Sequence, residues 1–186
     1  MTSASVRRVA DRLAEGSSTY LRAVTHADAA EFVAASVASR DLHHPWISAP
    51  QDAEAFSAYV DRVTDNPAKI GLVFCDLSDD RIAGSLNIGN IVRGSFSCAA
   101  LGYWAFAHAA GKGLMGDALD TVVRYAFGPL RLHRLEANVQ PGNARSIALV
   151  KRHGFRLEGF SPDFLYVDGA WRDHERWAIT TEMVPC

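Results

Sequence analysis

Residues 102–119 read GYWAFAHAAGKGLMGDAL. The stretch begins as an apolar, aromatic strand, passes through Gly111, Lys112 and Gly113, and continues as an amphipathic helix. A helix N-terminus presents unpaired N–H groups and the positive end of a dipole, and glycine lets a bound anion approach the backbone closely. The stretch therefore predicts either a phosphate-binding turn or a plain strand-to-helix turn that uses glycine for its geometry.

The composition is typical of one globular domain. The chain has 186 residues, of which 48% are hydrophobic and 22% charged, and a formal net charge of −2. A dedicated nucleic-acid-binding protein would carry a basic excess, so the composition disfavours that class. We find neither an apolar run of membrane-spanning length nor the apolar segment of a signal peptide, and we expect a cytoplasmic protein that binds no membrane.

Neither cysteines nor histidines suggest a metal site. Cys75, Cys98 and Cys186 are odd in number and widely spaced, so we expect neither a disulfide framework nor a zinc site, and a reducing compartment suits the chain. The pair His43 and His44 has no carboxylate or third histidine at ligand spacing, so we expect no metal cofactor.

Hydrophobic periodicity and turn residues divide the chain into alternating strands and helices. Residues 1–18 are expected to form a helix or a loose arm, and residues 19–186 a single domain. The predicted helices cover 25–39, 52–65, 114–127 and 143–153, and the predicted strands cover 19–23, 70–76, 81–91, 99–107, 133–140 and most of 155–182. This order predicts an α/β (α+β) domain built on a mixed sheet.

A second motif, RLEANVQPGNARSIALVKRHGF at 134–155, follows the glycine turn. With HAAGKG at 108–113 and YVDGAWRDHERWAITTE at 166–182, it resembles the GNAT superfamily of acetyl-CoA-dependent N-acetyltransferases. The finer resemblance is to the RimJ/RimL branch, which acetylates the N-terminal α-amino groups of proteins. It extends from Tyr20 onward and implies the GNAT fold, a mixed, mostly antiparallel sheet of about seven strands, splayed into a V and flanked by about four helices.

The resemblance implies acetyl-CoA as co-substrate. Backbone amides of the glycine turn would hold the pyrophosphate, amides near 104–106 would polarise the thioester carbonyl, and the pantetheine arm would lie in the V. The expected cofactor contacts are Trp104, Ala105, Phe106, His108, Gly111, Lys112, Gly113, Leu114, Met115, Asn143, Ser146, Lys151 and Arg152.

Several of these residues also have plainer interpretations. Trp104 and Phe106 could be ordinary core aromatics. Lys151 and Arg152 could be the solvated end of a helix, where positive charge is favoured. His108 stands where the family usually has Arg or Gln, which would weaken rather than abolish cofactor binding, or it could be a surface residue.

The resemblance also implies two catalytic residues. Glu136 would act through water as the base that takes the amine proton; alternatively it is a strand carboxylate that pairs with Arg134 or Arg156. Ser146 would protonate the departing thiolate, because the tyrosine that other family members use is replaced by Val150; alternatively Ser146 is a helix-capping residue.

The acceptor site is less defined by the sequence. By resemblance, loops 40–51 and 160–170 would wall it, and its expected contacts are His44, Trp46, Asn87 and Tyr166. Asp173 and His174 cannot act as a catalytic dyad, because adjacent strand residues face opposite ways. The acceptor is expected to be a protein N-terminus, with a small amine as the alternative; an inactive CoA-binding module and either a monomer or a homodimer also remain open.

Overall fold

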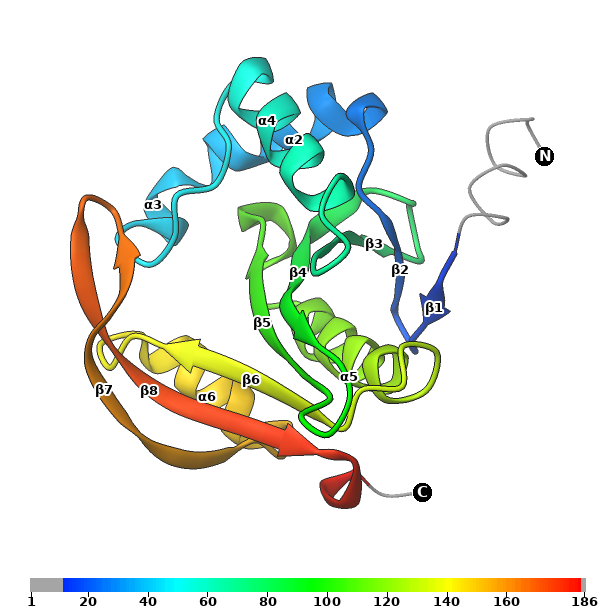
Figure 1. The fold of residues 1–186 in the computed structure, drawn as a ribbon. Helices are drawn as coiled ribbons and strands as arrows, with labels where there is room; N and C mark the ends of the chain where they lie inside the picture. The colour runs from blue at the N-terminus through cyan, green and yellow to red at the C-terminus, as the bar shows by residue number, and fades with distance from the viewer. Residues whose placement is uncertain (1–11, 185–186) are drawn as a thin grey trace.

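The computed structural model describes residues 12–184, which form one eight-stranded sheet in the order β1-β2-β3-β4-β5-β6-β8-β7 (Figure 1). Neighbouring strands run antiparallel except β5 and β6, which are parallel. The strands are β1 (Ala14–Glu15), β2 (Thr19–Ala23), β3 (Ile70–Asp76), β4 (Ile82–Val92), β5 (Cys98–Ala105), β6 (Arg134–Val139), β7 (Arg156–Val167) and β8 (Ala170–Thr180).

The helices follow the predicted positions with one addition. They are α2 (Ala29–Ala38), α3 (Arg40–His43), α4 (Ala53–Thr64), α5 (Leu114–Phe127) and α6 (Ala144–Arg152). The predicted capping box is present, since the Thr25 amide donates to Asp28 Oδ2 at 2.8 Å, but it opens a 3₁₀ turn (His26–Asp28) before α2. The short helix α3 lies in a segment predicted as loop.

The mixed, mostly antiparallel sheet is confirmed, and it has one strand more than the sequence suggested. The extra strand is β1, which pairs with β2 through Ala14 opposite Leu21. Two residues are too few to show an alternating pattern, so sequence periodicity could not reveal it. Most of the predicted N-terminal helix or arm (1–18) lies outside the described residues.

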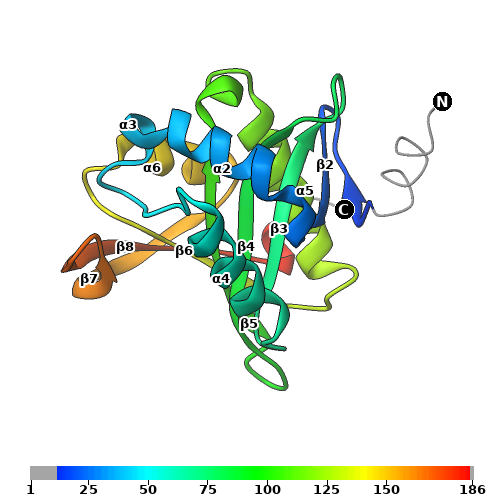
Figure 2. The same ribbon diagram turned by 90° about the horizontal axis from the view of Figure 1, so that it is seen from above.

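A separate hydrophobic cluster covers each face of the sheet. Helices α2 and α4 cover one face with Phe32, Phe56 and Val60, and Figure 2 shows both helices lying across β3 and β4. On the other face, α5 contributes Leu119 and α6 contributes Val150. Side chains on adjacent strand residues supply the two clusters alternately, as the two-residue period of a strand requires.

A partly buried carboxylate fixes α5 to the start of the sheet. Asp117 accepts hydrogen bonds from the amides of Ser17, Ser18 and Thr19 at 2.8 to 3.0 Å and from Thr19 Oγ1 at 2.7 Å. Burial alone raises the pKa of Asp117, but these hydrogen bonds outweigh it and hold the pKa below its ordinary value. The helix that begins at the glycine turn therefore has a fixed position against β2.

Within residues 12–184, none of the helices combines the length and the apolar content that crossing a membrane requires.

Candidate functional site

The most distinctive feature of the sheet is the separation of β5 from β6. The two strands pair at three positions only, from Cys98 opposite Arg134 to Ala100 opposite Glu136. Beyond them, β5 continues to pair with β4 as far as Ala105, and β6 with β8 as far as Val139. The strands meet near their starts and then diverge (Figure 1), so the predicted V is present, with an unpaired strand edge on each arm.

Two backbone amides of the predicted set face away from the V. The Phe106 amide donates to Ala83 O at 2.8 Å, so it cannot polarise a carbonyl group in the V, and the Phe106 side chain is fully buried. Because amides alternate along a strand, the Trp104 amide also faces β4, and the Ala105 amide faces the V instead. The Trp104 ring packs against Phe32 of the α2 and α4 cluster, as a core aromatic would.

The glycine turn has the geometry of an anion-binding loop. Gly111 and Gly113 have φ values of +77° and +80°, and Gly113 caps α5. A Cβ atom at either glycine would meet nothing within 4 Å, so the space beside the loop is open. Among the hydrogen bonds of the described residues, none uses the amides of 111–115, and the exposed Lys112 adds a positive charge beside them. Leu114 is buried in the core and Met115 packs against it.

His108 is not a free surface residue. Its ring stacks on Phe106 with 6.2 Å between centroids. Burial, with a smaller contribution from Arg81, lowers the pKa of His108, so the imidazole is neutral at pH 7. His108 therefore cannot supply the charge of the arginine usual at this position, and the loop depends on its amides and Lys112.

A cavity of about 110 Å³ lies in the opening of the V. In it, Tyr103 Oη lies 2.6 Å from Ser146 Oγ, which joins β5 to the first turn of α6. Burial raises the pKa of Tyr103 to about 12, so its hydroxyl keeps its proton at neutral pH. The cavity is lined by Trp46, Ile47, Leu101, Gly102, Tyr103, Asn138, Val139, Gln140, Asn143, Ser146 and His174.

Ser146 does not cap its helix through its side chain. Asn143 is the N-cap, and its Oδ1 accepts from the Ser146 amide at 3.1 Å, whereas Ser146 Oγ is bonded to Tyr103. Sequence reasoning missed Tyr103 because its contact with Ser146 spans 43 positions in the chain. The alternation of side chains along β5, which turns Tyr103 and Leu101 to the same face, is the signal that could have singled it out.

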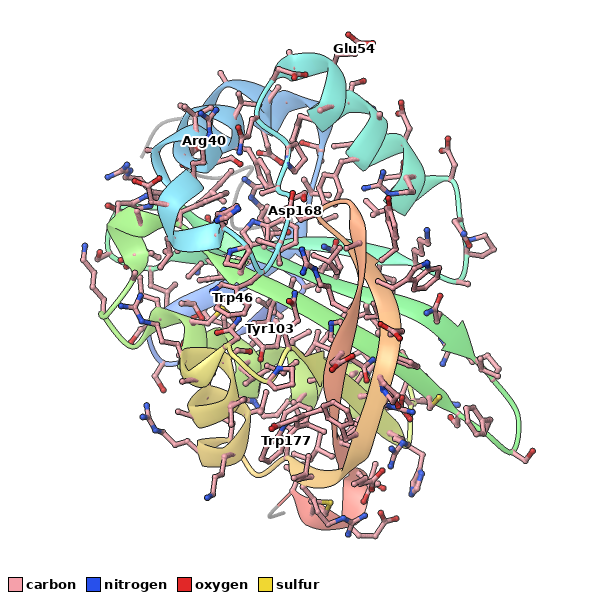
Figure 3. The ribbon with its side chains drawn as sticks, turned by 90° about the vertical axis from the view of Figure 1, so that its left-hand side faces the viewer. Arg40, Trp46, Glu54, Tyr103, Asp168 and Trp177 are labelled. Atoms are coloured by element: carbon pink, nitrogen blue, oxygen red, sulfur yellow. The ribbon has the colours of Figure 1, made fainter. Side chains whose placement is uncertain are left out.

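A larger cavity of about 630 Å³ lies on the α2 and α4 side of the sheet. His44 Nε2 is 3.6 Å from Asp168 Oδ2, so the turn between β7 and β8 reaches the segment after α3; Figure 3 shows Asp168 at the tip of that hairpin. Asn87 lines the same cavity, and its Oδ1 accepts from Tyr59 Oη at 2.7 Å. Trp104 lies in this wall too, so the two cavities flank β5.

Glu136 is held by two arginines. Its Oε1 accepts from Arg134 Nε at 2.9 Å and its Oε2 from Arg176 at 3.3 Å. Both carboxylate oxygens of Glu136 are therefore already engaged by guanidinium groups. The geometry therefore supports the ion-pair interpretation over the base, and the partners are Arg134 and Arg176 rather than the predicted Arg156.

Three other predicted residues lie away from both cavities. Lys151 and Arg152 are exposed at the end of α6 and line neither cavity. Tyr166 is 63% exposed near the tip of the β7–β8 hairpin, where its ring meets Trp171 edge-on with 5.7 Å between centroids. Over residues 12–184, no group of three or more His, Cys, Asp or Glu side chains is arranged to hold a metal ion.

Comparison with known proteins assigns the family. The model of the acetyltransferase (GNAT) domain matches residues 19–156, and the chain belongs to this family. The RimJ of Mycobacterium smegmatis, solved in complex with CoA-disulfide, is 31% identical, with a TM-score of 0.83 over 90% of this chain and 84% of that one.

Two further proteins with this fold or sequence similarity differ in the acceptors that their names state. The Escherichia coli ribosomal protein uS5-alanine N-acetyltransferase is 44% identical over 106 residues, which cover 57% of this chain but only 55% of the relative. A spermidine N-acetyltransferase chimera from Vibrio cholerae and hSSAT has a TM-score of 0.74 at 19% identity, which shows a shared fold alone. The fold therefore does not select the acceptor.

The open space beside Gly111 gives a test of the glycine turn. Gly111→Ala should weaken acetyl-CoA binding about tenfold, because the new Cβ would occupy the space that a phosphate needs. Lys112→Ala should weaken it less, since the amides remain. Binding is measured by isothermal titration calorimetry.

The matched control is Gly94→Ala. Gly94 also has positive φ (+73°) and open space around it, but it lies in the β4–β5 hairpin. Both variants incur a similar backbone strain, and only the Gly111 variant should lose affinity. Equal acetyl-CoA affinity in the two variants would contradict an anion site at this turn.

Proposed function

We propose that this protein transfers the acetyl group of acetyl-CoA to the N-terminal α-amino group of a protein. The observation that carries the proposal is the hydroxyl pair of Tyr103 and Ser146, 2.6 Å apart in the opening of the V of a GNAT domain. The free, buried thiols of Cys75 and Cys98 suit the reducing cytoplasm in which it would act.

The arms of the V and the glycine turn would hold acetyl-CoA. The amides of 111–115 bind the pyrophosphate, and the pantetheine arm lies between the unpaired edges of β5 and β6, where it adds to the sheet as a strand would. Exposed Lys151 and Arg152 can reach only the outer, phosphate-bearing end of the cofactor. The Ala105 amide faces the V and polarises the thioester carbonyl.

In this mechanism the amine attacks the thioester directly, in a ternary complex with both substrates. The amine nitrogen forms a bond to the carbonyl carbon, the C–S bond breaks, and Ser146 Oγ gives its proton to the CoA sulfur. The nitrogen loses one proton as the amide forms. The Tyr103 hydroxyl, bonded to Ser146 Oγ, holds that oxygen in place and relays this proton back to it. An α-amino group has a pKa of about 8, so a modest shift suffices to make it nucleophilic at neutral pH.

The charge of the larger cavity favours a peptide over a polyamine. Its described lining includes Arg40 and Arg62 against a single carboxylate, Asp168, which already pairs with His44. A polycation would be repelled there and would find no free carboxylate. His44, Trp46 and Asn87 remain our acceptor contacts, and the name of the Escherichia coli relative supports a small first residue such as alanine.

The three candidate functions are separated by one thiol-release assay with acetyl-CoA. Peptides that begin with Ala or Ser should release CoA, whereas spermidine and free amino acids should release little. Turnover of the small amines but not of the peptides would contradict the proposal. An inactive CoA-binding module would bind acetyl-CoA, with a raised melting temperature, and release no thiol with any acceptor.

The role of Ser146 is tested by Ser146→Ala. We expect kcat to fall about tenfold to hundredfold with little change in acetyl-CoA affinity, because the proton is given only in the transition state. Folding stability should fall only by the loss of the Tyr103 hydrogen bond, since the Asn143 cap binds the Ser146 backbone rather than its side chain. Tyr103→Phe, which keeps the ring, should give a smaller loss. An unchanged kcat in Ser146→Ala would rule out the proton-donor role.

A further inference from the structure

The mechanism above needs a group that takes the proton of the amine, and Glu136 is poorly suited to that role because two arginines hold it. The inference that follows rests on the proposed function. Another side chain that acts as the base must be able to accept a proton, must have a lone pair that no hydrogen bond uses, and must face the cavity where the amine meets the thioester.

Two side chains in the small cavity meet the first condition. Of the described residues that line it, only Tyr103 and His174 are titratable, and none carries a permanent charge. The Tyr103 hydroxyl keeps its proton and is bonded to Ser146, on the acid side of the reaction. His174 is 3% exposed, and it reaches the cavity from β8.

The hydrogen bond of His174 fixes which nitrogen is free. Its Nδ1 lies 2.8 Å from the Arg172 carbonyl oxygen, two residues back on the same strand. A carbonyl oxygen can only accept, so Nδ1 carries the hydrogen. Nε2, at the end of the ring away from its own backbone, then holds a lone pair. The hydrogen bond to the backbone carbonyl therefore fixes the tautomer and leaves Nε2 as the nitrogen that can accept a proton.

Asn138 supplies a second hydrogen-bond acceptor in the same cavity. Its Oδ1 is buried and has no hydrogen-bond partner among the described residues. A buried polar atom without a partner costs free energy, and in a site it indicates a ligand that donates. An amine donates N–H groups, so a carbonyl oxygen and an imidazole nitrogen in one cavity form a suitable receptor for it.

The groups packed around His174 are aromatic, polar and charged. From β7, Phe164 meets the His174 ring edge-on with 6.1 Å between centroids, and Ser161 lies opposite it in register. Two charged groups lie on its own face of β8: Arg176, which pairs with Glu136 and stacks on Phe164, and Arg172, whose Nε donates to the Val167 carbonyl at 3.5 Å. Arg172 offers its carbonyl, and the Asp173 carboxylate is engaged by the Asp163 amide.

We propose that His174 is the general base of the reaction and that Asn138 positions the amine beside it. The ammonium group enters the cavity, and Nε2 of His174 takes one of its protons. The neutral nitrogen attacks the thioester carbon, the C–S bond breaks, and Ser146 protonates the sulfur. The nitrogen loses its second proton as the amide forms, and that proton restores the Ser146 hydroxyl through Tyr103. The products are the acetylated amine and CoA, and the proton on His174 leaves to solvent.

The test is His174→Asn, whose side-chain amide can still donate to the Arg172 carbonyl. Turnover of an alanine-initiated peptide is measured from pH 6 to 9.5. At pH 7 we expect kcat/KM to fall about hundredfold with acetyl-CoA affinity retained. The loss should shrink at higher pH. Without His174 the reaction requires an amine that is already neutral, and the amine becomes neutral above its own pKa of about 8. Asn138→Ala should mainly raise KM for the peptide.

Glu136→Gln is the matched control on the same face of the sheet, and any loss it causes should be equal at every pH. A His174→Asn variant with full kcat/KM at pH 7, or with a loss constant across pH, would overturn the proposal. If the variant does not fold, the pH profile of the wild-type enzyme tests the proposal instead. A wild-type kcat/KM that falls with pH around the amine's own pKa would also overturn the role of His174. If the wild-type enzyme does not turn over the peptide at all, the proposed function fails, and the role of His174 fails with it.

Discussion

The candidate site depends on the short pairing between strands β5 and β6. Strands β5 and β6 share three register positions and then separate, while each keeps its outer neighbour. Unpaired backbone N–H and C=O groups on a strand edge are costly to bury and ready to pair with another chain. An extended, amide-bearing ligand can satisfy both edges, which is why the opening suits the pantetheine arm of acetyl-CoA.

Contacts from outside the sheet hold the V open. His43 Nε2 donates to the Ala105 carbonyl at 2.9 Å, and the Ala107 amide donates to Ser39 Oγ at 2.8 Å, so the junction of α2 and α3 fixes the end of β5. On the other arm, Trp46 packs over Gly142, where a Cβ atom would lie 3.0 Å from the indole. The segment after α3 and the turn between β6 and α6 are therefore packed against each other, and Trp46 and Tyr103 line the same cavity (Figure 3).

Local patterns predicted most of the helices and strands, and the family resemblance predicted the V between two of the strands. The glycine turn, the Asn143 cap and the position of Ser146 depend on neighbours in sequence, and each could be predicted. The partners of Glu136 and Ser146 could not, because they depend on the register of β6 with β8 and on the approach of β5 to α6. Strand alternation predicts that Asp173 and His174 face opposite ways, but only the three-dimensional fold brings His174 into the cavity that Ser146 also lines.

Hydrogen–deuterium exchange, with and without CoA, tests most directly whether the V is a binding site. CoA should slow exchange at the Tyr103 and Ala105 amides on β5, at amides of 137–139 on β6 and at amides of 111–115 in the glycine turn, because these groups gain partners or are shielded. The β4–β5 hairpin around Gly94 should exchange equally in both states. Unchanged exchange on both arms of the V at saturating CoA would contradict the account.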